Sequence, residues 1–193
     1  MFDRGFKAWC ERISLQKRQA MGLMAHEPLD PFALAEKLGI LVWRVDKIAD
    51  LEPQFLNVLL KEDPDSWSAI TLNENGHTLI VVNPTHSRRR LSSDVAHELA
   101  HILIGHNPTR VDLTEDGLLL LSNFDKKQED EAKWLCGCLL LPREALIDIK
   151  KRKLSDDLAK ETFVVSQQML TYRMQMSGVN EQFKRLSRKW RGA

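Results

Sequence analysis

The spacing of apolar residues predicts an alternation of helices and strands in the first third of the chain. Residues 2–24 carry apolar side chains at helical intervals, which predicts a first, amphipathic helix. A second helix is predicted over 31–38, with Asp30 as its N-cap and Pro31 at its first position. The apolar run 40–45 predicts a strand, whereas residues 46–65 show no period and predict an irregular segment.

A β-hairpin and a helix are predicted in the middle of the chain. Apolar and polar residues alternate over 67–72, residues 77–83 form a second predicted strand that Pro84 closes, and the turn-forming run Asn73-Glu74-Asn75-Gly76 separates the two. The apolar positions of 95–103 recur at helical spacing, and Gly105 is a natural helix stop. A strand pair followed directly by a half-buried helix is therefore expected here.

The remainder of the chain predicts mostly helix. Residues 107–125 favour a loop with one short apolar element, and 126–141 form a strong helical pattern that a proline ends. A basic helix is predicted over 143–153 and two short helices within 155–178. The tail, 183–190, again has helical spacing amid basic residues.

This succession predicts an α+β fold of one domain with a helical appendage. We expect a core over residues 1–142, in which a small mixed or antiparallel sheet packs on two helices, and a basic helical module over 143–193. The first part holds 16 basic and 21 acidic residues, and the second holds 12 and 6. The net charge of +1 gives no global field that would indicate a nucleic-acid or membrane partner.

The composition favours a cytoplasmic protein. No apolar run approaches the roughly 18 residues that a spanning helix needs, and the N-terminus has no signal-peptide core. The three cysteines, an odd number, favour a reducing compartment. Cys136 and Cys138 would diverge on a helix, so we expect small buried apolar residues and not a metal knuckle.

The motif His97-Glu98-Leu99-Ala100-His101 predicts a metal site. Histidines at i and i+4 lie on one helix face, one turn apart, so both imidazoles can reach one Zn²⁺. Glu98 between them is placed to accept a proton from water. The run Leu91-Ser92-Ser93-Asp94 supplies N-cap candidates for a well-formed helix. Hydrolysis of an amide bond, above all a peptide bond, is the expected chemistry.

A catalytic zinc site needs a third protein ligand, and His106 is the first candidate. The extended motif of one class of zinc proteases would require glycine at position 104 and histidine at 107. The chain has Ile104 and Asn107 instead, which disfavours that class. His106 is better interpreted as a residue at the helix C-terminus, where a cation is favoured.

A carboxylate from the helix predicted over 126–141 is the stronger candidate. Glu129 shares a face with the small residue Ala132, and small residues allow two helices to approach closely. Glu131 points to a different face, together with Leu135. Glu129 is therefore the favoured ligand, and the alternatives are Glu131, Asp125, Asp112 and Asp116.

The order of these motifs resembles the ImmA/IrrE family of bacterial and phage metallopeptidases. The resemblance spans about residues 30–175 and rests on four segments. They are Gly39-Ile40-Leu41-Val42, Ile80-Val81-Val82-Asn83, Ala96-His97-Glu98-Leu99-Ala100-His101 and Glu129-x-Glu131-Ala132-x-x-x-Cys136, the last followed by Leu139-Leu140-Leu141-Pro142. The resemblance implies a zincin-like core, a zinc cofactor and Glu129 as the usual carboxylate ligand.

The chain departs from that family's second-helix pattern at three positions. Lys133 replaces the usual Asn or Asp, Leu135 the usual Phe, and Cys136 the usual Ala. The change at Lys133 removes an acceptor that would help to orient the site.

The resemblance also implies a partner. Family members are often encoded beside a gene for a helix-turn-helix repressor, and they cleave the repressor protein. Cleavage releases genes of a phage, a mobile element or a stress response from repression. Residues 1–30 are too short for a DNA-binding domain of that kind, so the repressor would be a separate protein. Direct binding of nucleic acid is not expected, although the basic C-terminal segment leaves it open.

Substrate contacts are less well specified by the sequence. Ile80, Val81 and Val82 could pair with an extended substrate, or form an ordinary buried strand. No oxyanion-stabilising residue is identified among the candidates His77, His86, Tyr172 and Arg173. The run Arg88-Arg89-Arg90 reads as a solvated loop, with substrate or nucleic-acid contact as the alternative.

Two functions therefore compete. The first is a zinc endopeptidase that acts on a regulatory protein. The second is a non-catalytic regulatory or binding module, such as a sensor or an antitoxin-like partner, that retains the peptidase fold. The two functions differ in whether Glu98 acts as a general base in peptide hydrolysis.

Overall fold

The computed structural model describes residues 2–49, 51–74, 76–106, 110–113, 119–122 and 125–191. The N-terminal half of the described chain contains the elements α1 (Phe6–Ala20), α2 (Pro31–Lys37), β1 (Leu41–Arg44), η1 (Val45–Lys47), α3 (Pro53–Asn57), η2 (Val58–Glu62), β2 (Ala69–Glu74), β3 (His77–Val82) and α4 (Arg88–Ile104). It is followed by β4 (Arg110–Leu113), β5 (Leu119–Ser122), α5 (Lys126–Leu140), α6 (Arg143–Arg152), α7 (Asp156–Thr162), α8 (Gln167–Met176) and α9 (Val179–Arg191).

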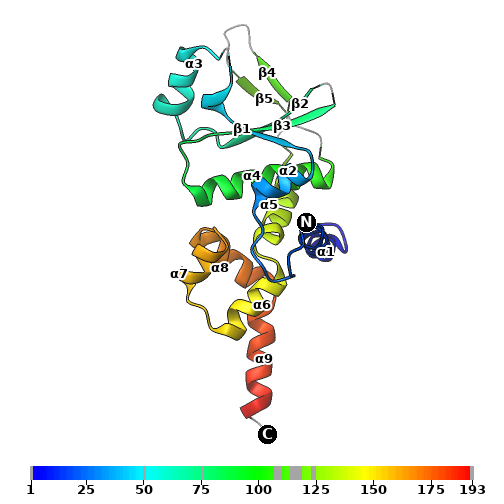
Figure 1. The fold of residues 1–193 in the computed structure, drawn as a ribbon. Coiled ribbons are helices and arrows are strands. Elements are labelled where there is room, and N and C mark those ends of the chain that lie inside the picture. The colour runs from blue at the N-terminus through cyan, green and yellow to red at the C-terminus, as the bar shows by residue number, and fades with distance from the viewer. Residues whose placement is uncertain are drawn as a thin grey trace.

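The expected α+β architecture is present, with a small three-stranded sheet among helices. The strand order is β1-β3-β2, with β1 parallel and β2 antiparallel to β3. In Figure 1 the sheet lies on one side of α4, and α5 lies on the other. The helices α6 to α9 extend from the far end of α5 (Figure 1).

The central position of β3 corrects one expectation about the substrate. Ile80, Val81 and Val82 are buried, and each pairs with residues of both β1 and β2. β3 therefore has no free edge on which a substrate strand could add, and it is the ordinary buried strand of the two alternatives. The edge strand nearest to α4 is β2, which contacts that helix directly.

The helix α4 begins earlier than the sequence pattern indicated. Ser87, and not a residue of 91–94, is the N-cap, and its hydroxyl oxygen accepts from the amide of Arg90 at 3.3 Å. The three arginines expected in a loop therefore form the first helical turn. The Arg90 guanidinium reaches Asp65 at 2.8 Å and Ser68 at 3.0 Å, which ties this turn to the segment before β2.

Two other regions differ from their expected structure. The segment predicted to be irregular contains η1, α3 and the single π-helical turn η2. In the region predicted as a loop, β4 and β5 pair antiparallel in a separate two-stranded sheet. These elements are only three to five residues long, so their apolar residues establish no period.

The C-terminal end of α5 is held by two fully buried arginines. Arg18 of α1 donates to the carbonyl of Leu139 at 2.8 Å, and Arg173 of α8 donates to that of Leu141 at 2.9 Å. Helix ends leave such carbonyls without intrahelical partners, so each guanidinium satisfies one of them. A side chain at Gly137 would meet Arg173 at 2.8 Å, so glycine allows the close approach of α8.

The predicted helices of residues 143–191 all form and share one core with the rest of the chain. Leu146 of α6, Phe163 beyond α7 and Leu170 of α8 belong to the same cluster of buried residues as Leu99 of α4. The division into a core and a module at residue 142 stays a prediction. No helix in the described ranges is long and apolar enough to cross a membrane.

The cysteines are free and buried, as expected of small apolar core residues. Burial raises the pKa of Cys10 and of Cys136 to about 12, so both thiols are protonated at neutral pH.

Candidate metal centre

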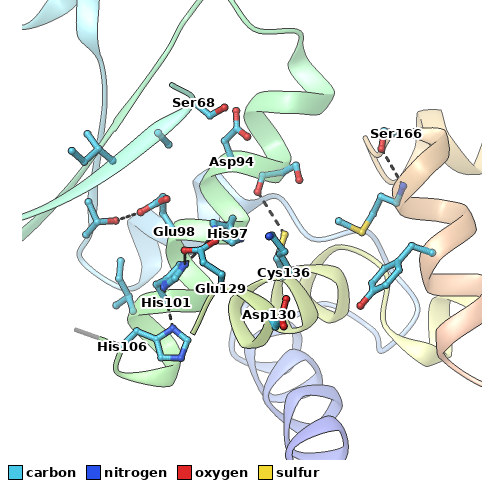
Figure 2. A pocket seen from close by; sticks show the side chains of 18 of the residues that line it. Ser68, Asp94, His97, Glu98, His101, His106, Glu129, Asp130, Cys136 and Ser166 are labelled. Atoms are coloured by element: carbon cyan, nitrogen blue, oxygen red, sulfur yellow. Dashed lines mark hydrogen bonds and ion pairs between the residues drawn. The ribbon is translucent and has the colours of Figure 1, made fainter. Parts of the chain in front are cut away.

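Two neighbouring helices bring three potential metal ligands together. His97 and His101 lie one turn apart on α4, and Glu129 projects from the first turn of α5, which packs along α4. Figure 2 shows the three side chains converging between these helices. All three residues are those that the sequence favoured, and among the described residues they form the group whose ligand atoms lie within 4.8 Å of one another.

The geometry of the three residues fits a tetrahedral metal ion. Nε2 of His97 and Nε2 of His101 are 3.1 Å apart. Oε2 of Glu129 lies 3.3 Å from Nε2 of His97, and Oε1 of Glu129 lies 3.2 Å from Nε2 of His101. Ligand atoms at zinc–ligand distances of about 2.0–2.1 Å in a tetrahedron are roughly 3.3 Å apart. Two imidazoles and one carboxylate also match a donor set that leaves the fourth position open.

The protonation states suit ligation. Burial lowers the pKa of His101 to about 4, so its imidazole is neutral at neutral pH and keeps a lone pair for a metal. A hydrogen bond from His97 lowers the pKa of Glu129, which is therefore an anionic carboxylate. The nearby charge of Lys133 acts in the same direction.

Glu98 lies beside this cluster in a different environment. Burial raises its pKa above that of an ordinary carboxyl group, although a hydrogen bond from Thr71 opposes the rise. The Thr71 hydroxyl donates to Oε2 of Glu98 at 2.5 Å. Thr71 comes from β2, and the sequence did not single it out. Its position in an alternating strand was visible, but its contact with α4 depends on how the sheet packs.

A cleft of about 1000 Å³ contains the three candidate ligands and Glu98. One wall is β2, with Ala69, Ile70, Thr71 and Asn73, and the floor is formed by α4 and α5. The far wall belongs to the C-terminal helices, with Met169 and Tyr172 of α8 (Figure 2 shows α8 across the cleft from α4).

The alternative third ligands lie elsewhere. Glu131 is 8% exposed and contacts His106, and Asp125 caps α5 by accepting from the amide of Lys127 at 2.8 Å. Asp116 and the side chain of Asp112 lie outside the part of the chain that the structure describes.

The four candidates for an oxyanion-stabilising residue lie in different parts of the structure. His86 is buried and pairs with Asp94 at 3.2 Å, and Arg173 is buried against α5. His77 is exposed at the start of β3. Only Tyr172 of these four lines the cleft. Burial raises the pKa of Tyr172, so its hydroxyl keeps its proton and remains a donor.

Comparison with known families gives one match. The family model described as the IrrE N-terminal-like domain, Peptidase_M78, matches residues 35–175. This range contains β1 to β5 and the helices that carry all four site residues. No curated protein and no solved structure matches the chain.

Proposed function

The chain belongs to the IrrE N-terminal-like family of peptidases, and we propose that it is a zinc-dependent endopeptidase that cleaves a regulatory protein. The family suggests a metallopeptidase. The observation that carries the proposal is the spacing of 3.1–3.3 Å among the Nε2 atoms of His97 and His101 and the carboxylate of Glu129. That spacing is close to the roughly 3.3 Å between neighbouring ligand atoms of a tetrahedral zinc site.

In the proposed mechanism each residue has a separate role. His97, His101 and Glu129 would hold the ion, which would supply Lewis-acid polarisation of a carbonyl and acidification of water. Glu98 accepts the proton of the attacking water and passes it to the leaving amine. Its raised pKa makes it a stronger base than an exposed carboxylate, and the Thr71 hydroxyl fixes its orientation.

We propose that the substrate lies along β2 and not along β3. The amide of Asn83 donates to the carbonyl of Ser68 at 2.9 Å, which makes this a hydrogen-bonded pair of the antiparallel ladder. Because such pairs alternate with residues whose backbone groups face away, Ala69, Thr71 and Asn73 direct theirs to the free edge. An extended peptide added there would pass beside Glu98.

Replacing Ala69 with proline tests this edge. The Ala69→Pro change removes an outward amide without removing a bond to β3, so we expect kcat/KM to fall about two- to tenfold. Ala69→Val retains the amide and is the matched control, with kcat/KM near the wild-type value. Equal kcat/KM for both variants, at unchanged zinc content, would exclude pairing through this amide.

The proposed substrate is a helix-turn-helix repressor encoded beside this chain. The support is the family membership, together with the cleft of about 1000 Å³ that contains the candidate ligands and Glu98. The zinc-loaded protein should convert the purified repressor into two fragments, seen by mass spectrometry as a single hydrolysed peptide bond. A chelator such as 1,10-phenanthroline should stop cleavage, and added Zn²⁺ should restore it. A repressor that stays intact with the zinc-saturated protein would contradict this substrate.

A further inference from the structure

His106 occupies a buried position between a candidate metal ligand and a carboxylate. Its side chain is 6% exposed. Nδ1 of His106 lies 3.0 Å from Nδ1 of His101, and its Nε2 lies 3.2 Å from Oε2 of Glu131 (Figure 2 shows His106 below His101). Glu131 of α5, His106 just beyond the end of α4 and His101 of α4 thus form a continuous series of contacts that reaches the ring of a candidate metal ligand.

The backbone at the end of α4 explains why His106 is there. Gly105 adopts the left-handed conformation with φ 82°, which a residue with a side chain rarely adopts. The amide of Gly105 donates to the carbonyl of Ile102, and the amide of His106 donates to the carbonyl of His101 at 3.0 Å. In this helix ending the side chains of positions 101 and 106 meet, usually as an apolar pair. Here the pair is two imidazoles.

The hydrogen-bond partners assign the proton positions along the chain. A carboxylate only accepts, so Nε2 of His106 carries the proton that it donates to Glu131. When the His106 ring carries only this proton, its Nδ1 is an acceptor, and Nδ1 of His101, 3.0 Å away, donates to it. With its proton on Nδ1, His101 presents the lone pair of Nε2 to the other ligands.

We propose that His106 and Glu131 are positioning residues that fix the tautomer and ring orientation of His101 for metal binding. The proposal rests on the zinc site of the proposed function. Histidine ligands generally donate their second ring nitrogen to an outer partner, and loss of that partner weakens metal affinity. In this chain the acceptor is another histidine, His106, which Glu131 orients in turn. Two side chains therefore fill the role that one outer partner usually has.

The burial of Glu131 also fits this role. A carboxylate that is 8% exposed needs polar partners, and His106 supplies one. The ammonium group of Lys127 lies 3.8 Å from the other oxygen of Glu131, but Lys127 is itself exposed and pairs with Asp3 at 3.0 Å. His106 is therefore the buried partner that keeps Glu131 aligned.

The test is the zinc affinity of the full-length protein, measured by competition with a chromophoric chelator. His106→Leu removes the acceptor and should weaken zinc binding about 10- to 100-fold. In His106→Asn the amide oxygen can take the place of Nδ1, so most of the affinity should return. Glu131→Leu should weaken binding less than His106→Leu, and the double variant should be no weaker than His106→Leu alone, because the two residues act in series. His77→Leu, an exposed control, should bind zinc as the wild type does.

These outcomes separate this proposal from the proposed function. If the wild type binds zinc and His106→Leu binds it equally well, the relay is excluded and the zinc site stands. Equal losses in the Leu and Asn variants, or additive losses in the double variant, would also exclude it. If the wild type does not bind zinc, the proposed function itself fails. The melting temperature of the metal-free variants shows whether each protein is folded.

Discussion

Glu98→Gln should lower the rate of peptide-bond cleavage by about 10²- to 10⁴-fold while leaving the zinc content unchanged. Glutamine has nearly the same shape, and its amide oxygen can still accept the hydrogen bond from Thr71. It cannot take a proton from water at neutral pH. The variant therefore loses the general base but keeps the shape of the side chain and its hydrogen bond to Thr71. The measurement is kcat at saturating substrate, together with zinc per protein by mass spectrometry.

The control for this variant is Glu36→Gln, which changes an exposed carboxylate on α2 and should leave kcat unaltered. Cleavage by Glu98→Gln at the wild-type rate would exclude Glu98 as the base. If neither the wild type nor the variant cleaves any partner although both hold zinc, the chain would be the non-catalytic regulatory module that the sequence also allowed.

Removal of Glu129 should have the largest effect on metal binding. Glu129→Ala deletes one of the three groups that the geometry assigns to the ion, so zinc affinity should fall by more than the roughly 100-fold upper range for loss of an outer partner. Glu131→Ala deletes a carboxylate on the same helix that contacts His106 instead, and it should cost less. Titration of both metal-free variants with Zn²⁺ measures the two losses side by side.

The order of the two losses decides between the carboxylates. A greater loss in Glu131→Ala than in Glu129→Ala would reverse the assignment of ligand and positioning residue. Equal, small losses would show that neither carboxylate binds the ion.

The residues within one helix were the easiest to foresee. The pairing of His97 with His101 follows from helical periodicity alone, and Glu129 follows from its place beside Ala132 on the second helix. Ala132 is fully buried where α5 meets α4, which is the close approach that the pattern predicted. Short-range periodicity therefore carried most of the candidate site.

The rest depends on contacts between distant segments, which a single sequence does not encode in its spacing. Thr71 meets Glu98 only because β2 packs over α4, and His106 meets Glu131 only because α4 and α5 are aligned. The central place of β3 depends on β1, which pairs with it from far along the chain. For the same reason the apolar pattern of residues 80–82 did not distinguish an edge strand from a central one.

The start of α4 shows how tertiary contacts can override a local signal. Ser92 and Ser93 are acceptable N-cap residues, yet the helix extends a further turn to Ser87. Arg90 in that turn pairs with Asp65 and Ser68, which lie before β2. The added turn is thus stabilised by groups that no local pattern places nearby.

The most direct test of the central claim is anomalous X-ray scattering at the zinc absorption edge from crystals of the zinc-loaded protein. We expect one strong peak about 2.0–2.2 Å from Nε2 of His97, from Nε2 of His101 and from a carboxylate oxygen of Glu129. A peak beyond ligand distance of either histidine, or no peak between α4 and α5 when zinc is saturating, would contradict the proposed metal centre and the mechanism built on it.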